Sequence, residues 1–279
     1  MKKNLPIYFY FLILAIFFVP GKTYAGGPIG KFRNVFVPAF GYYSATDIWD
    51  VHGIKIKGMD GTGFQSYSLN LFNDYGISRR LDFFTTLPIV YQTSKYSNGK
   101  HEAYGPTDLQ TGLSYVLINA RSERYLTIQA SAIIPLYNKS NPNTDIGFGS
   151  FGSEVKLSFS GNLGKQIIKG CYFNTEIYYR RYFNNDGPNQ YGILAFLGFA
   201  LSKSNQVTID AVAIKSVSLN RSYNTNVSSI RDFSLIKPSL RFGHRFNRRF
   251  SLFAGGFYTV YGRNTGVGYG TTISGIFHL

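Results

Sequence analysis

The sequence NLFNDYGISRRLDFFTTLPIVY, residues 70–91, sets two aromatic-rich apolar runs on either side of a charged turn, Ser78-Arg79-Arg80. Both runs alternate apolar and polar residues, which is the period of a β-strand with two unlike faces. The short interruption between them favours a tight turn between neighbouring strands. The stretch therefore predicts an antiparallel hairpin, and the same pattern recurs to the end of the chain.

Residues 1–25 have the pattern of a cleaved secretory signal peptide: Lys2 and Lys3, an apolar run from Leu5 to Val19, and the small residue Ala25. A single-pass anchor is the alternative, but the run is about 15 residues long and a spanning helix needs about 20. We therefore expect a signal peptide at 1–25 and one exported domain at 26–279.

The composition of that domain favours strands that cross a membrane. The chain has 22 Tyr, 25 Phe and 30 Gly, and only 15% of its residues are charged, whereas soluble domains carry about 25%. After residue 25 no apolar run is long enough for a spanning helix, so a membrane crossing would use strands. A soluble exported β-sandwich is the alternative.

The charge balance points to anionic partners outside the cytoplasm. Removing Lys2, Lys3 and Lys22 leaves 26 basic residues against 14 acidic ones, a formal charge of +12. Dispersed cations on an exported chain suit membrane lipids, lipopolysaccharide phosphates or anionic solutes better than nucleic acid. The single cysteine, Cys171, excludes an internal disulfide and is interpreted as a small lipid-facing residue.

Turn signals divide the mature chain into an even number of runs, twelve in all: 35–50, 61–78, 81–96, 105–121, 125–140, 149–163, 170–184, 190–203, 206–221, 232–246, 249–263 and 266–279. Connections at one end are short, and at the other end those near 51–60, 97–104, 141–148 and 222–231 are longer. Even strand number, short periplasmic turns and longer external loops are typical of bacterial outer-membrane barrels. The predicted fold is all-β, a transmembrane antiparallel up-and-down β-barrel of about 12 strands in the bacterial outer membrane.

Basic residues gather in the short turns. A cation on the lipid face costs about 2–4 kcal/mol at the bilayer midplane and about 0–1 kcal/mol near the interface. The pattern predicts that basic turns mark the periplasmic edge of the membrane; the alternative is solvated turns of a soluble protein. The basic turn residues are Arg79, Arg80, Arg124, Arg248 and Arg249, and equivalent places hold Arg121, Lys165, Lys169, Lys203 and Arg245.

The last residues, GTTISGIFHL, place Ile273, Gly275, Phe277 and Leu279 on one face of a terminal strand. This strand resembles the signal by which barrel-insertion machinery recognises outer-membrane barrels, although Leu279 stands where an aromatic residue is usual.

Three stretches carry a family resemblance: DYGISRRLDFFTTLPIVY, YGPTDLQTGLSYVLI and LTIQASAIIPLYNKS. In order, they contain a Tyr-Gly-Ile turn at 75–77, a strand proline, a Gly-x-x-Asp-Leu strand start at 105–109 and a second strand proline. This order resembles the outer-membrane protein family associated with the MetA-pathway of phenol degradation. The resemblance covers most of the mature chain, but its motifs are short and structural. It implies a monomeric barrel that passes hydrophobic or aromatic compounds, and it assigns no ligand residue.

Prolines fall inside extended runs, where they cannot donate to the strand ladder; they are Pro38, Pro88, Pro135 and Pro238. We expect each to mark a bulge or kink. Such kinks either set local curvature or shape the lumen and a sideways exit for apolar solutes.

One face of 171–182 suits water and is predicted to line the lumen. The predicted solute path consists of Tyr172, Glu176, Tyr178, Arg180, Asp210 and Arg241, and Glu154 and Lys156 are further inward charges. These charges form either a salt-bridge network that holds the wall or a ladder that orients passing solutes.

Motifs for chemistry are weak. GFGSFG at 147–152 matches a dinucleotide loop but runs into a strand rather than a helix, and TGVGYG at 265–270 lacks the helices of a potassium filter. None of the four histidines has a serine two residues later, as a barrel hydrolase would require, and no cluster has metal-ligand spacing. We therefore expect no enzyme activity, metal or cofactor.

These observations predict a passive channel for small apolar or aromatic compounds. Twelve strands lie between a filled interior and an aqueous pore, so we expect a narrow lumen, partly closed by residues 26–34 or by an inward loop. A structural or adhesive barrel with a closed lumen is the alternative, and a barrel hydrolase is a weaker one.

Overall fold

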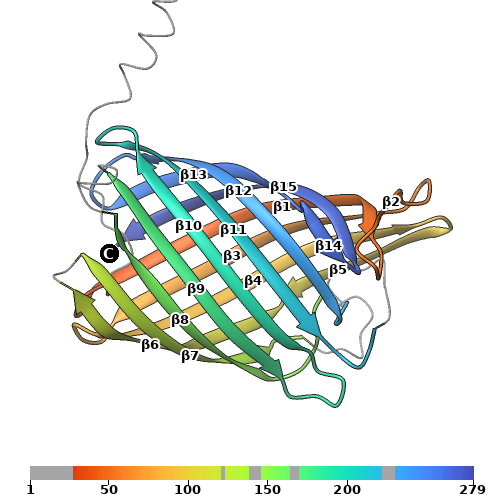
Figure 1. Cartoon of the computed structure of the whole chain (residues 1–279), viewed down its shortest axis with the longest axis horizontal. Helices are drawn as coiled ribbons and strands as arrows, with labels where there is room; N and C mark the ends of the chain where they lie inside the picture. Colours follow the sequence, from red (N-terminus) through yellow and green to blue (C-terminus); the bar gives the residue numbers. More distant parts are fainter. Residues whose placement is uncertain (1–27, 121–122, 138–145, 164–169, 222–229) are drawn as a thin grey trace, which may run out of the picture.

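The computed structural model describes residues 28–120, 123–137, 146–163, 170–221 and 230–279. In this part of the chain every regular element is a strand, and the strands form one closed barrel (Figure 1). No helix among the described residues is long and apolar enough to cross a lipid bilayer. The predicted signal peptide, residues 1–25, lies outside the described residues.

The described strands form a barrel wall of twelve. One is split into β5 (Gly99–Pro106) and β6 (Asp108–Ala120), and another into β13 (Phe250–Tyr258) and β14 (Tyr261–Arg263). The short β2 (Lys55–Ile56) pairs only with β1. The other ten are β1 (Asn34–Trp49), β3 (Gly63–Gly76), β4 (Leu81–Tyr96), β7 (Arg124–Pro135), β8 (Gly152–Asn162), β9 (Cys171–Tyr182), β10 (Asn189–Ala200), β11 (Asn205–Val217), β12 (Phe233–Arg245) and β15 (Thr265–His278).

Every pairing is antiparallel and joins strands that follow one another along the chain, apart from the pair β1–β15 that closes the ring. In that pair Phe36 lies opposite Phe277 and Tyr43 opposite Gly270. Closure removes the two free edges that an open wall would have, as a sheet in hydrocarbon requires, while β2 and β5 pair on one side only. The prediction of a twelve-stranded up-and-down barrel is confirmed.

Two predicted boundaries were wrong in instructive ways. Residues 97–104 were expected to form a loop, but β4 and β5 continue as a hairpin in which Tyr96 pairs with Gly99. The run 125–140 ends as a strand at Pro135. Cross-strand pairing extends the β4–β5 hairpin past the residues that were expected to form its loop. Pro135 ends β7 because proline has no backbone N–H to donate to the strand ladder.

The prolines lie where pairing is interrupted. Pro88 faces Thr107, which separates β5 from β6, and the Thr107 amide donates to the Pro88 carbonyl at 2.9 Å. Pro238 lies opposite the gap between β13 and β14, and the pairing of β1 with β15 skips Pro38. The register shifts that mark a bulge or irregularity do not fall at these prolines but between Ala45 and Asp47 and between Val116 and Ile118.

The outer face carries an apolar band between two aromatic belts. At one end Phe250 stacks on Phe277 at 4.7 Å, and toward the other end Tyr67 lies 6.5 Å from Tyr91. Between them large apolar side chains are about half exposed; they include Phe40, Ile193, Leu240 and Ile273. An apolar band with aromatic girdles is the exterior of a transmembrane barrel, so this face lies against lipid.

Candidate functional site: the barrel lumen

Alternate residues of β9 face inward. Ile177 and Tyr179 point outward and are 51% and 40% exposed, whereas Tyr172 and Glu176 line an internal cavity of about 670 Å³. The same cavity is lined by Val37 of β1, which stands six strands away around the twelve-membered ring. Opposite walls share this cavity, so it is part of the lumen.

The cavity lies toward the end of the barrel where Asn34 pairs with Leu279. The short turns are also at this end, which in outer-membrane barrels faces the periplasm. Apolar and polar side chains share its wall: Val37, Leu194, Phe196, Phe253 and Ile276 on one hand, and Asn174, Gln206, Thr208, Arg241, Arg245 and Arg248 on the other.

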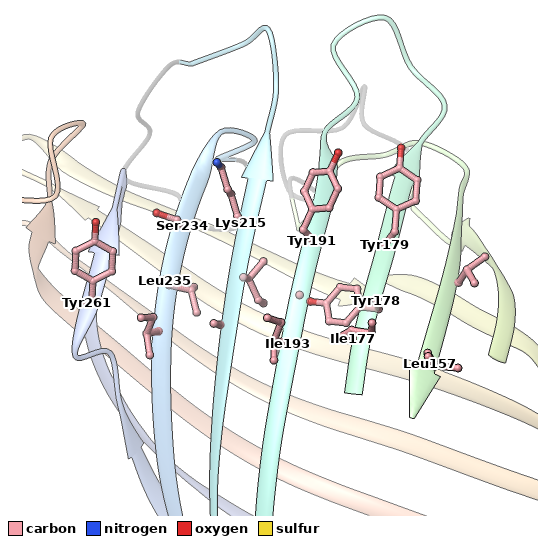
Figure 2. Close-up of a pocket in the computed structure, with 15 residues that line it drawn as sticks. Leu157, Ile177, Tyr178, Tyr179, Tyr191, Ile193, Lys215, Ser234, Leu235 and Tyr261 are labelled. Atoms are coloured by element: carbon pink, nitrogen blue, oxygen red, sulfur yellow. The ribbon is translucent and has the colours of Figure 1, made fainter. Parts of the chain in front are cut away.

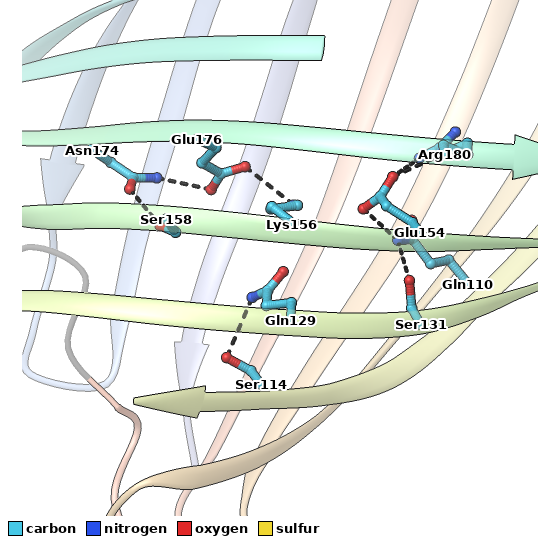
Figure 3. Close-up of polar contacts among 10 residues, drawn as sticks. All are labelled: Gln110, Ser114, Gln129, Ser131, Glu154, Lys156, Ser158, Asn174, Glu176 and Arg180. Carbon is cyan, nitrogen blue, oxygen red and sulfur yellow. Dashed lines mark hydrogen bonds and ion pairs between the residues drawn. The ribbon is translucent and has the colours of Figure 1, made fainter. Parts of the chain in front are cut away.

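A polar network crosses the inner wall from β6 to β9 (Figure 3). Arg180 donates to Glu154 Oε2 through Nε at 2.9 Å and Nη2 at 2.6 Å. Gln110 Nε2 donates to Glu154 Oε1 at 2.9 Å and to Ser131 Oγ at 2.9 Å. The Glu154 side chain is only 3% exposed, so these donors replace the water that a buried carboxylate would otherwise need.

A second ion pair in this network joins Lys156 Nζ to Glu176 Oε2 at 3.1 Å. Asn174 Nδ2 donates to Glu176 Oε1 at 2.9 Å, and Ser158 Oγ donates to Asn174 Oδ1 at 2.9 Å. The predicted lumen charges Glu154, Lys156, Glu176 and Arg180 are thus brought together in pairs.

Two more pairs hold the opposite side of the lumen. Arg241 Nη2 contacts Asp210 Oδ1 between β12 and β11, and Arg263 Nη1 donates to Asp232 Oδ2 at 2.8 Å. Burial raises the pKa of Asp232, but hydrogen bonds from Arg263 and from the Ser218 amide outweigh it and hold this pKa below the usual aspartate value.

Tyr172 and Tyr178 lie flat against the wall because each ring covers a glycine on β10. A Cβ at Gly198 would lie 2.1 Å from Tyr172 Cζ, and one at Gly192 would lie 2.1 Å from Tyr178 Cε1. Any larger residue would push the ring into the lumen. The two tyrosines of the predicted solute path therefore form part of the wall surface.

An apolar cluster at the extracellular end includes Phe148 from the β7–β8 connection. Phe148 packs edge-on against Tyr182 at 4.8 Å and joins Ile133 in a buried core. The Gly149 amide donates to the Tyr137 hydroxyl at 2.7 Å, and burial raises the pKa of Tyr137, so the hydroxyl stays neutral. This inward fold narrows the entrance; the GFGSFG motif around Phe148 was not interpreted in this way from sequence.

Only part of the predicted plug at 26–34 is described. Residues 28–33 lie along the periplasmic rim, where the Phe32 amide donates to the Gly76 carbonyl at 2.7 Å and the Ile29 amide reaches Asp82 Oδ2 at 3.4 Å. Phe32 itself is 68% exposed. Residues 26 and 27 lie outside the described residues.

The outer face carries a groove of about 660 Å³ near the extracellular rim (Figure 2). Ile177, Ile193 and Ile236 line it, and the hydroxyls of Tyr179 and Tyr191 point toward the extracellular connections. Most of its lining side chains belong to the lipid-facing set, although the Tyr178 ring also reaches it, so the groove opens toward the bilayer. It is not part of the lumen.

The predicted basic turns lie at the periplasmic end. Arg79 and Arg80 occupy the turn between β3 and β4, where the Arg80 amide donates to Ser78 Oγ at 3.1 Å. Arg248 and Arg249 are exposed in the turn between β12 and β13. Arg124 is the first residue of β7 rather than a turn residue, because it pairs with Ala120 and Gly161. Arg121, Lys165 and Lys169 lie outside the described residues.

Groups for metal or nucleophilic chemistry are sparse in the described part of the chain. No three His, Cys, Asp or Glu side chains there are placed to hold a metal ion. His244 Nδ1 lies 2.7 Å from Asn205 Oδ1. Cys171, expected to face lipid, is buried at 2% exposure; its short side chain lies opposite Phe199 and is covered by its neighbours.

Comparison with known proteins identifies the fold. No protein-family model matches the chain, and no curated protein matches it in sequence. The COG4313 outer membrane channel from Pseudomonas putida F1 is similar in structure, with a TM-score of 0.71 and 13% identity over 94% of this chain and all of that one.

Two further solved structures share the architecture more loosely. The NanC porin has a TM-score of 0.52 and 8% identity over 87% of this chain and 99% of its own. The translocator domain of the autotransporter NalP from Neisseria meningitidis has a TM-score of 0.51 and 11% identity over 90% of this chain and 89% of its own. The chain thus has the fold of a bacterial outer-membrane β-barrel, and its girdled exterior belongs in that membrane.

Proposed function

We propose that the protein is a passive outer-membrane channel for small molecules with an apolar or aromatic body. The observation that carries this proposal is the internal cavity of about 670 Å³, in which Phe196, Tyr172 and Phe253 stand beside polar groups. Cavities of this size that combine apolar walls with a few polar groups suit small organic ligands. The resemblance to the MetA-pathway family and the fold shared with a channel support the same assignment.

The proposal gives the predicted residues a role. Tyr172 and Tyr178 offer ring faces to a passing solute, and the paired charges of Glu176, Arg180, Asp210 and Arg241 keep the wall polar and fixed. We also propose a monomer in which the basic turn residues outside the lumen contact lipid phosphates and the insertion machinery recognises the terminal strand. Ile273 and Leu279, both more than half exposed, would present that signal.

Liposome swelling tests the channel directly. Purified protein would be reconstituted and challenged with phenol, benzyl alcohol and glycerol, and vesicles without protein would set the baseline. Leu194→Trp adds bulk to the cavity wall, whereas Leu197→Trp adds the same bulk to the lipid face, where Leu197 is 40% exposed. We expect Leu194→Trp to slow entry and Leu197→Trp to match the wild type.

A closed structural barrel is the competing function, and the apolar cluster around Phe148 favours it. That function predicts that correctly inserted protein admits none of the solutes. Entry equal to protein-free vesicles would therefore rule out the channel.

A further inference from the structure

The cavity wall carries cations that no carboxylate neutralises. Arg241, Arg245 and Arg248 line it, and Glu176 is its acidic residue. Glu176 is paired with Lys156 and Arg241 with Asp210. Among the described residues no carboxylate pairs with Arg245 or Arg248; the Arg245 guanidinium donates to the Lys203 carbonyl instead. The cavity therefore keeps a positive field.

Two hydrogen-bond donors at one height of the wall lack an acceptor. Thr208 on β11 lies opposite Arg241 on β12 in the strand register. Thr208 is 1% exposed and its hydroxyl has no partner. Arg241 Nε has none either, whereas Nη2 of the same guanidinium contacts Asp210. Buried donors without acceptors are uncommon in folded proteins, and these two are neighbours.

Thr208 and Arg241 both line the cavity, so a solute inside it would lie beside these donors. The residues next to this pair in the strand register are Gly198 on β10 and Gly255 on β13. A Cβ at Gly255 would lie 2.5 Å from Arg241 Cγ, so the arginine stem lies over bare backbone. Phe196, Phe253 and Ile276 provide apolar wall nearby.

We infer that this cavity binds small amphipathic organic anions, with a carboxylate at Thr208 and Arg241 and an apolar body against Phe196 and Phe253. A carboxylate has two oxygens and matches the two free donors, and a charge-assisted hydrogen bond to Arg is stronger than a neutral one. Arg245 and Arg248 extend the positive field toward the periplasmic mouth. This inference rests on the proposed channel function and specifies its solute class.

Three solutes of the same size separate charge from shape: benzoate, benzyl alcohol and benzylamine, which are anionic, neutral and cationic at neutral pH. Entry into liposomes would be measured at about 0.05 M salt and again at higher salt. We expect benzoate to enter about tenfold faster than benzylamine, since a charged cleft concentrates counter-ions by this order. Added salt should reduce the ratio because it screens the field.

Variants locate the effect. Arg248→Gln removes a cavity cation, whereas Arg249→Gln removes the adjacent turn cation, which does not line the cavity. Thr208→Val keeps the side-chain shape and deletes the hydroxyl. The benzoate preference should fall in Arg248→Gln and in Thr208→Val and stay unchanged in Arg249→Gln.

The outcomes of the two proposals are distinguishable. If none of the three solutes enters faster than it enters protein-free vesicles, the channel itself fails. If all three enter at equal rates, or if Arg249→Gln reduces the preference as much as Arg248→Gln does, the channel stands and the anion site is overturned. A shift of the zero-current potential in a KCl gradient toward cation selectivity would also overturn it.

Discussion

The inner wall is held by charges that satisfy one another. The Glu154 carboxylate is almost fully buried and receives hydrogen bonds from Arg180 and Gln110. Taking charges out of water is expensive, so a pair of this kind is sensitive to the loss of one partner rather than strongly stabilising in itself. These residues therefore fix the shape of the lumen more than they add to the stability of the barrel.

Replacing Glu154 by Gln should destabilise the barrel by about 3 kcal/mol, because the Arg180 charge is left without a carboxylate in a site where it is 26% exposed. Urea unfolding in detergent, followed by circular dichroism, would measure the loss. Glu102→Gln is the matched control, since Glu102 pairs with Lys100 on the surface. Equal stability of Glu154→Gln and the wild type would show that water in the lumen already screens the pair.

A second residue-scale effect depends on pH. The lowered pKa of Asp232 means that its ionised form stabilises the folded state above the ordinary aspartate pKa, and this contribution is lost as the pH falls through the folded-state value. We expect wild-type Tm to drop more than that of Asp232→Asn between pH 7 and pH 3, by an amount equivalent to about 1–3 kcal/mol. Asp60→Asn, at a fully exposed carboxylate, should retain the wild-type pH response. Parallel curves for wild type and Asp232→Asn would contradict the assignment.

At the scale of strands, alternation of residue type was sufficient to predict the wall. Residues 171–182 show the two faces in the sequence, and the structure uses them as inner and outer faces. Alternation is local and so can be read from a single strand. The β4–β5 hairpin was missed because cross-strand pairs such as Tyr91 with Tyr104 depend on register between strands, which a single run of residues does not contain.

The lumen was predicted less completely for the same reason. Arg241 was identified from its charge, but Thr208 was not, since its importance comes from lying opposite Arg241. Likewise the fit of Tyr172 over Gly198 follows from the pairing of β9 with β10. Phe148 was missed because its inward position depends on contacts with Tyr182 that are distant in sequence.

The barrel should tolerate a strand proline only at positions where the strand pairing is already interrupted. The carbonyl of Pro88 faces Thr107, and the missing amide hydrogen lies on the same side, at the break between β5 and β6. Pro88→Ala should therefore change stability by less than about 1 kcal/mol. Val90→Pro, where pairing with Gly105 is uninterrupted, should cost about 3 kcal/mol. Heat-modifiable migration on gels would rank the variants, and equal losses in both would argue that Pro88 shapes the strand actively.

At the scale of the whole molecule, the lumen has three sections in series. An apolar cluster lies at the extracellular end, paired charges line the middle, and a cavity with an excess of arginines opens toward the periplasm. Flow through sections in series is limited by the narrowest. In the cluster around Phe148, side chains of β7, β9 and β12 meet at the extracellular end, so this cluster should set the rate of entry.

Phe148→Ala should raise single-channel conductance by roughly twofold or more, because it removes a ring that packs on the inward-facing Tyr182 at the entrance. Phe151→Ala is the matched control from the same connection, since Phe151 is 61% exposed and outside the cluster. The Phe148 change also removes buried apolar area and should cost about 3 kcal/mol, so circular dichroism must show an intact barrel. If intact Phe148→Ala protein conducts no better than Phe151→Ala, the constriction lies elsewhere. If neither variant conducts at all, the closed structural barrel becomes the better account, because the widest opening available to this lumen would still admit nothing.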